Sequence, residues 1–588
     1  MSDSMPMGIR IRLSVMMFLQ FMLFAVWWQP LAAYLGNELG LTGGQMSPIL
    51  NTMALGCLIA PIIGMIADRY FASQKVLAVM NLLGAVLLVI AAKQTNPTSI
   101  FFVLLLQQLC YMPTWGLTTA VAMSNSSTEA FPQIRVFGSI GWVASGVFGF
   151  VALKFFGTTI DGTEIPFYCG AAVSLIAAGL ALTIPNTPPP AKGQKASIID
   201  VLGLRAVSLL KDFNFLMFIV VSTLVMIPFS IYWSYCSVFL SDKGFALISA
   251  TMNWGQFVEM FVMAFLLPLV LVRIGLKWAM SLGLGVLVVR YLFFLGGGMT
   301  DQTWMYMGAI LVHGFIYSFF FVGGQMYVGK KAPPELQAQA QGFLFLIMFG
   351  IGMLVGNTFN GNLIDKHSSP VLAAASGFKV ADGSHVGTDS ITVDGAAISD
   401  TKLYNRSLND TEVLVLATTN EKKRENLISE AAEKEVPVTV ALDQGVQYEG
   451  AWGGLANQGT ASEFTFAGLL TLPEDDPNSE DDDVLNGTLI TLGEGSDALA
   501  LTLKDNAVVI KAGSDEIVAR SMGLSRGSDN PTYLAISKGA DGMKLYANGS
   551  VYRTYNWQPI WSLTTICSAV LLVLIIFGFH YKEEKTAA

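Results

Sequence analysis

Long apolar runs, separated by short polar turns, fill most of the chain. They lie at about 10–35, 46–67, 75–93, 98–123, 135–156, 166–186, 213–240, 247–272, 277–297, 302–328, 339–364 and 557–580. Each run reaches the length of about 20 residues that a helix needs to cross the hydrocarbon core of a bilayer. The pattern therefore predicts twelve membrane-spanning helices. Only 13% of the residues are charged, against about a quarter in soluble domains, which agrees with a polytopic membrane protein.

The longest polar interruption among the first eleven runs divides the spans into two groups of six. It extends from Asn186 to Asp212 and contains TPPPAKGQK, a stiff and basic linker. Two six-helix halves around a basic central loop are the layout of the major facilitator fold. We expect an all-α membrane protein of this fold, with an N-terminal bundle at 1–186, a linker at 187–212, spans seven to eleven at 213–366, and span twelve with its tail at 556–588.

The distribution of lysine and arginine predicts the orientation of the chain, because cytoplasmic loops carry an excess of these residues. Placing both termini in the cytoplasm assigns fourteen Lys and Arg to cytoplasmic loops and four to outer loops, with residues 367–555 left out of the comparison. Residues 367–555 then lie on the extracytoplasmic side.

The segment between runs eleven and twelve differs in composition from the rest. Residues 368–555 hold 28 acidic and 14 basic side chains, whereas the remainder holds 15 acidic and 20 basic ones. Short alternating runs at 498–513 and 533–552, with Asp-Gly and Asn-Gly turn signals, predict antiparallel hairpins. EKKRENLISEAAEKE (421–435) predicts a helix. Because about 190 residues can bury a core of their own, we expect a folded, mainly β outer domain.

Two stretches of this domain resemble laminin-G-like or concanavalin-like jelly rolls. TKLYNRSLNDTEV (401–413) is similar to their closing strand and turn, and DGMKLYANGSVY (541–552) is similar to an internal hairpin. In those domains the first pattern follows the second, whereas here it precedes it. A circularly permuted jelly roll explains this order, and so does a coincidence of β patterns. The resemblance implies a glycan or surface polymer as a partner of the outer domain.

The sequence contains no pattern of an enzyme, a cofactor site or a metal site. All five cysteines lie in apolar segments, which excludes a disulfide framework and a thiolate metal site. The acidic run DDPNSEDDD (475–483) lacks the alternating ligands and the glycine of an EF-hand, so we interpret it as a solvated loop. Phosphate-binding loops and nucleophile elbows are absent, and we expect neither catalysis nor a nucleic-acid partner.

One acidic residue, Glu259, lies near the middle of a predicted span, within NWGQFVEMFVMAFLLPLVLV (253–272). A charged group at the bilayer centre costs roughly 2.5–3.5 kcal/mol, so such a residue faces protein or a water-filled cavity. Loss of water favours the protonated carboxyl. Glu259 is therefore a candidate substrate ligand or proton carrier. A structural glutamate in a hydrogen bond between helices is the alternative.

Other polar and aromatic residues share helical faces in a way that suits a ligand. Gln256 lies three residues before Glu259, and the pair offers donors and acceptors to a polyhydroxylated ligand. Arg135, Ser139 and Trp142 form one stripe of span five, where a ring can stack on a planar base and polar groups can bind its edges. A snorkelling arginine and an interfacial tryptophan would produce the same stripe.

Spans seven, nine and ten hold further candidates. Ser230 and Trp233 lie at i, i+3 in span seven, and His313 shares a face with Tyr317 in span ten. His313 can titrate near neutral pH, or it can be a neutral residue hydrogen-bonded between helices. Span nine is peripheral in the major facilitator fold, so for Arg290 we expect a structural ion pair or a snorkelling side chain.

The stretch GMIADRY (64–70) ends span two. Gly64 allows close helix approach, and Asp68 with Arg69 can pair at the cytoplasmic ends of neighbouring helices. This stretch is similar to the loop motif of major facilitators, which implies a role in conformational gating rather than in substrate contact.

Nine stretches, in order, resemble the nucleoside:H+ symporter family of the major facilitator superfamily. They are FLQF (18–21), GMIADR (64–69), YMPTWGL (111–117), FPQIRVFGSIGW (131–142), LGLRAVSLLKD (202–212), GQFVE (255–259), RYLFF (290–294), HGFIYSFFF (313–321) and AQAQGFLFLIMFGIGMLVG (338–356). The resemblance covers about 10–365 and 557–580 and leaves out the outer domain. It implies import of nucleosides with protons across the inner membrane of a bacterium, without a cofactor.

The resemblance also implies roles for individual residues. In that family an arginine, a hydroxyl and an aromatic ring of span five contact the nucleobase, and these match Arg135, Ser139 and Trp142. A glutamine and a glutamate of span eight contact the ribose and match Gln256 and Glu259.

The matches in spans seven and ten are looser. Polar residues of span seven line the pocket in the family, and Ser230 and Trp233 are the nearest counterparts here. The family commonly places an aspartate in span ten as a proton-coupling candidate, and here that position is Ser318. This difference leaves Glu259, together with His313, to carry the proton.

Two other functions stay open at the level of sequence. The same fold could carry another small polar solute such as a sugar. The outer domain could instead be the working part, a glycan-binding module on a transporter-derived anchor.

Overall fold

The computed structural model of the chain describes residues 6–581 with gaps. In the helical part the gaps are 127–129, 189–201, 203, 301 and 334–335, and in the outer domain they are 372–385, 388–396, 405, 420, 439–445, 448–462, 474–484, 493–498, 505–506, 513–514, 520–523 and 525–530. The acidic run 475–483 therefore lies outside the described residues.

The first half of the chain folds into a bundle of long apolar helices. It contains α1 (Met7–Trp28), α2 (Leu31–Ala33), the π-helical segment η1 (Tyr34–Glu38), α3 (Gly43–Tyr70), α4 (Ser73–Ala91), α5 (Pro97–Ser124), α6 (Phe131–Ala144), α7 (Val147–Phe156) and α8 (Ile165–Ala181).

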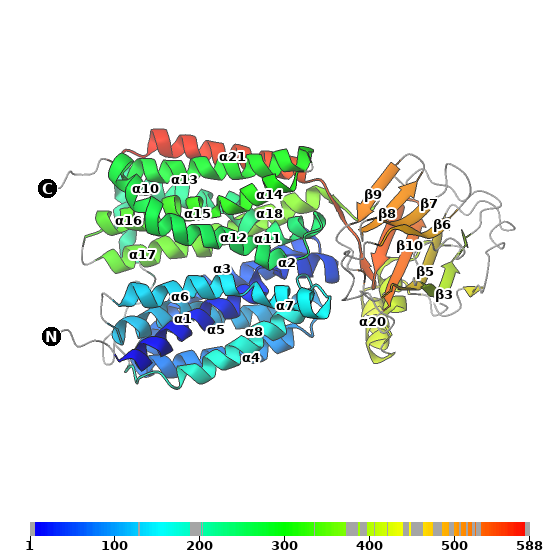
Figure 1. Ribbon diagram of the computed structural model, residues 1–588, viewed down its shortest axis with the longest axis horizontal. Coiled ribbons are helices and arrows are strands. Elements are labelled where there is room, and N and C mark those ends of the chain that lie inside the picture. Colours follow the sequence, from blue (N-terminus) through cyan, green and yellow to red (C-terminus); the bar gives the residue numbers. More distant parts are fainter. Residues whose placement is uncertain are drawn as a thin grey trace.

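The second bundle begins after the linker and is completed by the last helix of the chain. It contains η2 (Leu204–Lys211), α10 (Phe213–Leu224), α11 (Met226–Asp242), α12 (Ile248–Phe261), η3 (Val262–Leu266), α13 (Leu267–Thr300), α14 (Thr303–Leu311), α15 (His313–Ile316), η4 (Tyr317–Val322), α16 (Gly323–Lys331), α17 (Gln337–Phe345), η6 (Leu346–Gly352), α18 (Met353–Lys366) and α21 (Trp557–Gly578). Figure 1 shows the two bundles side by side, the first in blue and cyan and the second in green and red, with both termini at one end.

Each of the twelve apolar runs of the sequence is helical. In the part of the chain that the structure describes, ten helices are long and apolar enough to cross a membrane, and a further apolar helix, Ile165–Ala181, is shorter. The longest of the ten, Ile248–Thr300, carries two of the predicted runs. Gly275 separates these runs with a φ of 76°, a conformation that glycine adopts without a steric penalty.

Hydrogen bonds join the two bundles at the end opposite the termini. Asn37 Nδ2 donates to Ser241 Oγ at 2.7 Å. Asp161, in the loop after α7, accepts from both the backbone N–H and the hydroxyl of Ser249, each at 2.8 Å. Burial raises the pKa of the Asp161 carboxyl. These contacts hold the bundles together at this end.

Two glycines let α3 and α18 touch at the same end. A Cβ atom at Gly43 would lie 2.3 Å from the carbonyl oxygen of Gly361, and a Cβ at Gly361 would lie 2.5 Å from the carbonyl oxygen of Gly43. Real Cβ atoms do not come so close, because tightly packed interiors leave no room for such overlap. The contact between the bundles therefore depends on glycine at both positions.

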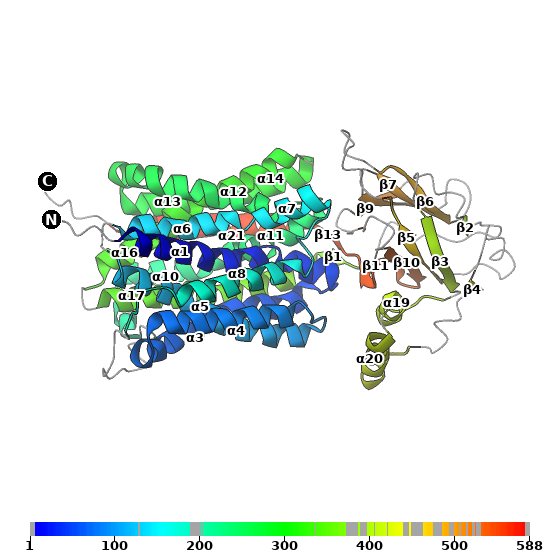
Figure 2. The ribbon, with the colours of Figure 1, turned by 60° about the horizontal axis from the view of Figure 1, so that its bottom comes forward.

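The outer domain is inserted between α18 and α21 through a short two-stranded ribbon. Strand β1 (Ser368–Ser369) pairs antiparallel with β13 (Thr554–Tyr555), with Ser369 opposite Thr554. The backbone N–H of Asn556 also donates to the carbonyl oxygen of His367 at 2.8 Å. Figure 2 shows β1 and β13 between the helices and the sheets. The chain thus enters and leaves the domain at one place, as the predicted insertion requires.

The described strands of the domain form two antiparallel sheets. One has the order β12 (Ser550–Val551), β11 (Gly542–Ala547), β10 (Thr532–Gly539), β5 (Phe464–Thr471), β3 (Ala397–Tyr404) and β4 (Val446–Gln447). The other has the order β2 (Val386–Gly387), β6 (Gly487–Leu492), β7 (Leu499–Lys504), β8 (Ala507–Ala512) and β9 (Asp515–Ala519). The predicted hairpins at 498–513 and 533–552 are confirmed as β7–β8 and β10–β11–β12.

Apolar side chains from both sheets share one core, so the sheets pack face to face. Phe466 and Leu534 of the first sheet belong to the same buried cluster as Leu501 and Val508 of the second. The other face of the first sheet is covered by α19 (Asp410–Ala417), whose Val413 is fully buried. The predicted helix at 421–435 is confirmed as α20 (Glu421–Glu433).

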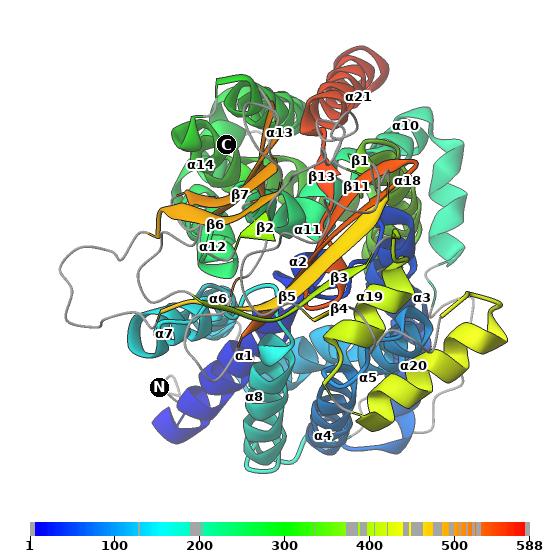
Figure 3. The same ribbon diagram turned by 90° about the vertical axis from the view of Figure 1, so that its right-hand side faces the viewer.

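The domain contacts both bundles at the end where they meet. The turn between β11 and β12 places Asn548 and Gly549 at φ of 49° and 84°, and the next residue, Ser550, donates its hydroxyl to the carbonyl oxygen of Glu38 in η1. Trp557 Nε1, at the start of α21, donates to Asp242 Oδ2 of α11 at 2.9 Å. Figure 3 looks onto the domain and shows it over the helix ends of both bundles.

The glycine contact between α3 and α18 generates a conformational prediction. A leucine at Gly361 cannot fit against Gly43, so we expect Gly361→Leu to separate the bundles at the end next to the outer domain. A cysteine at Asn51, which is buried at this interface, should then react with an impermeant thiol reagent at least several-fold faster. Gly179→Leu is the matched control, because nothing lies within 4 Å of a Cβ at that position. An unchanged labelling rate in Gly361→Leu would contradict the prediction.

Candidate substrate site

The stripe predicted on span five lies on α6 and faces the first helix. The guanidinium carbon of Arg135 lies 4.5 Å from the centroid of the Phe21 ring of α1, a distance typical of a cation–π contact. Ser139, one turn later, is partly buried. Trp142 is buried, with an indole N–H that has no hydrogen-bond partner among the described residues.

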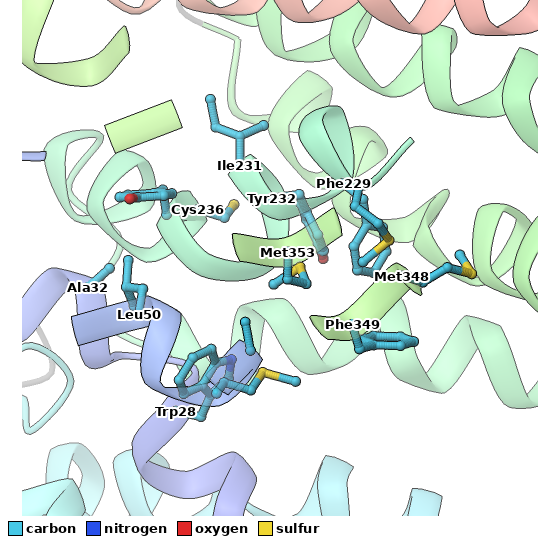
Figure 4. Packing of buried hydrophobic residues seen from close by; sticks show 14 of the residues in the cluster. Trp28, Ala32, Leu50, Phe229, Ile231, Tyr232, Cys236, Met348, Phe349 and Met353 are labelled. Atoms are coloured by element: carbon cyan, nitrogen blue, oxygen red, sulfur yellow. The ribbon is translucent and has the colours of Figure 1, made fainter. Parts of the chain in front are cut away.

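Aromatic rings connect the two bundles at the depth of this stripe. The ring centroids of Trp142 in α6 and Trp233 in α11 lie 5.5 Å apart with an interplanar angle of 38°. Trp233 also stacks on Phe229 at 5.6 Å. The interface continues as the cluster in Figure 4, where Tyr232 and Met353 of the second bundle lie opposite Trp28 and Leu50 of the first. Trp233 thus lies beside Trp142 at the contact between the bundles.

Glu259 lies in α12, close to Gln256 and His313. Its Oε2 atom is 3.8 Å from His313 Nε2. The same His313 nitrogen is 3.4 Å from Gln256 Nε2. The side chain of Glu259 is 13% exposed and that of His313 is 1% exposed. The Glu259 side chain therefore keeps a small exposed area, whereas the imidazole is enclosed by protein.

Two glycines set the distance between α12 and α15. A Cβ at Gly314 would lie 2.3 Å from the backbone nitrogen of Glu259, and a Cβ at Gly255 would lie 2.9 Å from His313 Cβ. The backbones of α12 and α15 therefore pack directly against each other at this point. This close contact places His313 beside Gln256 and Glu259.

Tyr317 and Ser318 follow His313 along the same span. The rings of His313 and Tyr317 have centroids 6.2 Å apart, and Tyr317 stacks on Phe321 at 5.3 Å. Ser318 is fully buried, and its hydroxyl has no hydrogen-bond partner in the described part of the chain. Tyr317 joins the ring cluster around His313, and Ser318 lies in the enclosed part of the bundle.

Ser230 has a different environment from Trp233. Its Oγ accepts a hydrogen bond from Asn360 Nδ2 at 2.9 Å and donates to the carbonyl oxygen of Ile227 at 3.1 Å. A Cβ at Gly356 would lie 2.5 Å from the same hydroxyl. The Ser230 side chain is thus engaged in packing between α11 and α18, and the structure does not bring it to the other candidates.

For Arg290 the expected snorkelling is wrong, because its side chain is completely buried. The guanidinium lies 3.9 Å from the centroid of the Tyr232 ring, and its Nε donates to the carbonyl oxygen of Ala309 at 3.2 Å. Its two terminal nitrogens have no hydrogen-bond partner among the described residues. Tyr232 in turn lies 5.0 Å from the His313 ring. No pattern in the sequence singled out Tyr232, which connects Arg290 to the site.

The proposed gating motif lies at the terminus end of α3. No atom comes within 4 Å of a Cβ at Gly64, so this glycine makes no close helix contact in the structure. Arg69 Nη1 donates to the carbonyl oxygen of Met65 at 3.2 Å. The side chain of Asp68 lies outside the described part of the chain.

A metal centre has no support in the part of the molecule that the structure describes. Among the described residues, no three His, Cys, Asp or Glu side chains are close enough together to hold a metal ion.

Known proteins with similar sequences are bacterial transporters. The putative nucleoside transporter YegT of Escherichia coli K12 is 37% identical over 362 residues, which cover 60% of this chain and 84% of that protein. The nucleoside permease NupG and the xanthosine permease of the same organism are 27% and 28% identical over 381 residues, covering 62% of this chain and 89% of each relative.

The same likeness extends to a solved structure and to the family as a whole. The crystal structure of NupG matches with a TM-score of 0.56 at 26% identity, covering 61% of this chain and 92% of that structure. The sequence profile described as "Nucleoside H+ symporter" matches residues 7–377. This chain belongs to the nucleoside H+ symporter family.

Proposed function

We propose that this protein imports nucleosides together with protons, by alternating access of its two helix bundles. Membership of the nucleoside H+ symporter family supports the function. The observation that carries the proposal is Glu259, whose side chain is 13% exposed and whose Oε2 lies 3.8 Å from His313 Nε2, in a span that has no other acidic side chain. A carboxyl in the interior of a membrane protein is where a proton can be bound and released.

The complete fold that we propose has twelve spans, six in each half. Ten long apolar helices and the shorter α8 support this arrangement. The break at Gly275 divides the longest of the ten into two spans. Both termini then lie in the cytoplasm and the outer domain lies outside the inner membrane of a bacterium, which the excess of Lys and Arg at the terminus end supports. Hydrogen bonds and glycine contacts between the bundles close the present structure at the end next to the outer domain.

The nucleobase is bound between the bundles by Arg135, Ser139 and Trp142. Trp142 and Trp233 approach to 5.5 Å across the interface, so both can offer a ring face to a base. Gln256 and Glu259 of the other bundle bind the ribose hydroxyls, and Tyr317 lines the same space. Contacts from both bundles to one solute are what a rocking transporter needs, because the solute then links the two halves at a site near the bilayer midplane.

The proton cycle follows from the surroundings of Glu259. In the outward-facing state Glu259 takes a proton from the acidic side, and closure around the nucleoside removes water from the neutral carboxyl at little cost. In the inward-facing state water returns, and the carboxyl releases its proton to the more alkaline cytoplasm. Transport of an unprotonated Glu259 through the closed state would bury a charge, which is costly.

For the outer domain we propose a jelly roll whose strand order is permuted. Its two antiparallel sheets and the placement of TKLY (401–404) at the end of β3, next to β5, support this topology. The ribbon of β1 and β13 allows such a module to be inserted without altering the bundles. A glycan or surface polymer is its proposed ligand class.

Replacing Glu259 by a neutral residue tests whether it couples proton movement to nucleoside transport. In proteoliposomes with an imposed pH gradient, Glu259→Gln is expected to lower nucleoside accumulation at least about 10-fold, because the amide cannot release a proton and the coupling is lost. Exchange of labelled for unlabelled nucleoside at equal pH should continue, since it needs no net proton movement. Full accumulation by Glu259→Gln would place the coupling residue elsewhere. Competition by a panel of nucleosides and sugars identifies the class of solute.

Removing the outer domain tests which part of the chain transports. Replacing residues 370–553 by Asn-Gly should close a hairpin between Ser369 and Thr554, which already face each other. We expect uridine uptake to persist within about two-fold, because the site residues all lie in the bundles. The same deletion carrying Glu259→Gln is the control for carrier-mediated uptake. Intact folding with complete loss of uptake would favour the outer domain as the working part.

A further inference from the structure

His313 presents a single nitrogen atom to both residues assigned to the ribose. His313 Nε2 lies 3.4 Å from Gln256 Nε2 and 3.8 Å from Glu259 Oε2. His313 Nδ1 is buried and has no hydrogen-bond partner among the described residues. The polar contacts of the buried imidazole are therefore confined to Nε2, which lies next to both the Gln256 amide and the Glu259 carboxyl.

The imidazole is held in place by rings on several sides. Its centroid lies 5.0 Å from that of Tyr232, 6.1 Å from Phe229, 6.4 Å from Trp233 and 6.2 Å from Tyr317. The close packing at Gly255 and Gly314 fixes the backbone on either side. A ring enclosed in this way cannot turn to find other partners, so any change in its hydrogen bonding must come from Gln256 or Glu259.

The chemistry of these groups allows only one of two hydrogen bonds at a time. A neutral imidazole has one acceptor nitrogen, and an amide NH2 can only donate. As the amide is oriented in the structure, Nε2 is therefore the acceptor and Gln256 the donor. An ionised Glu259 has no proton to donate to Nε2, whereas the O–H of a protonated Glu259 can donate to it. Nε2 has a single lone pair, so protonation of Glu259 displaces Gln256.

We propose that His313 is a positioning residue that links protonation of Glu259 to nucleoside binding by Gln256. With Glu259 ionised, the Gln256 amide is bound to His313 Nε2 and is not available to the solute. With Glu259 protonated, its O–H donates to Nε2, and the amide is released to bind a ribose hydroxyl. The proton stays on the Glu259 oxygen throughout and His313 stays neutral. This inference rests on the proposed function and explains how one carboxyl makes the two ligands bind together.

Two arginines and two tyrosines lie around this pair. They are Arg135 of α6 and Tyr317 of η4, which face Glu259, and Arg290 of α13 and Tyr232 of α11, which face His313. Arginine and tyrosine side chains do not change charge between about pH 6 and about pH 8. A change in nucleoside affinity over this range that is lost in His313→Phe is therefore assigned to the Glu259–His313 pair.

The test is the pH dependence of nucleoside affinity, measured by counterflow in proteoliposomes at equal pH on both sides. The wild-type protein should bind at least about five-fold more tightly near pH 6 than near pH 8, within the usual range for coupled sites. In His313→Phe, which keeps a ring in the aromatic cluster but has no acceptor, the ratio should fall to about one. His313→Gln retains an acceptor oxygen and should restore part of the ratio. Phe315→Leu, on the same helix, is the control for packing.

Each result supports or overturns a specific statement. Absence of nucleoside counterflow in the wild-type protein would contradict the proposed function itself. A wild-type ratio that persists unchanged in His313→Phe would overturn only the role of His313. If His313→Phe is not recovered folded, Gln256→Leu decides, because it removes the donor of the same hydrogen bond. A ratio near one in Gln256→Leu supports the link, and a wild-type ratio in that variant overturns it.

Discussion

The site depends on one carboxyl that is kept in the interior of a membrane protein by the approach of two helix backbones. Gly314 lets α15 come so close to α12 that a Cβ would lie 2.3 Å from the nitrogen of Glu259. This contact brings His313 to 3.8 Å from the carboxyl and to 3.4 Å from Gln256. A charge at this depth costs roughly 2.5–3.5 kcal/mol in lipid. The glycine contact therefore does more than let the helices pack, because it brings the polar side chain of His313 next to the carboxyl.

The helices themselves follow directly from the sequence, and the reason is physical. A bilayer span must satisfy its own backbone hydrogen bonds, so a long apolar run has few structures open to it. All twelve runs are helical, and the main break within a continuous helix falls at Gly275. The outer domain was predictable for a different reason: Asn548 and Gly549 adopt the positive φ that the Asn-Gly signal indicates.

The positions of polar residues within the bundles were harder to predict. Ser230 and Trp233 are three residues apart, yet the serine bonds to Asn360 in α18 while the tryptophan faces Trp142. A span with protein on several sides has polar neighbours in more than one direction, so helical spacing alone does not say which face meets the solute.

Two further features of the site have no signal in the sequence. The π-helical segment η4 begins at Tyr317, and an extra residue in a turn changes the face on which the following residues lie. The position of Ser318 could therefore not be derived from α-helical spacing. For Arg290 a structural ion pair or a snorkelling side chain was expected, but its guanidinium lies over Tyr232 inside the bundle, an arrangement that depends on a partner from another helix.

The inserted domain is covalently attached to one bundle and hydrogen-bonded to the other. Its ribbon joins α18 and α21, whereas Ser550 donates to the carbonyl oxygen of Glu38 in the first bundle. When the bundles separate at this end, the domain cannot keep both attachments in their present geometry, because rigid-body rocking moves one bundle relative to the other. The hydrogen bond to Glu38 is the attachment that can break. The free energy of that bond, about 0.5–1.5 kcal/mol for a typical hydrogen bond, then adds to the stability of the state closed next to the domain.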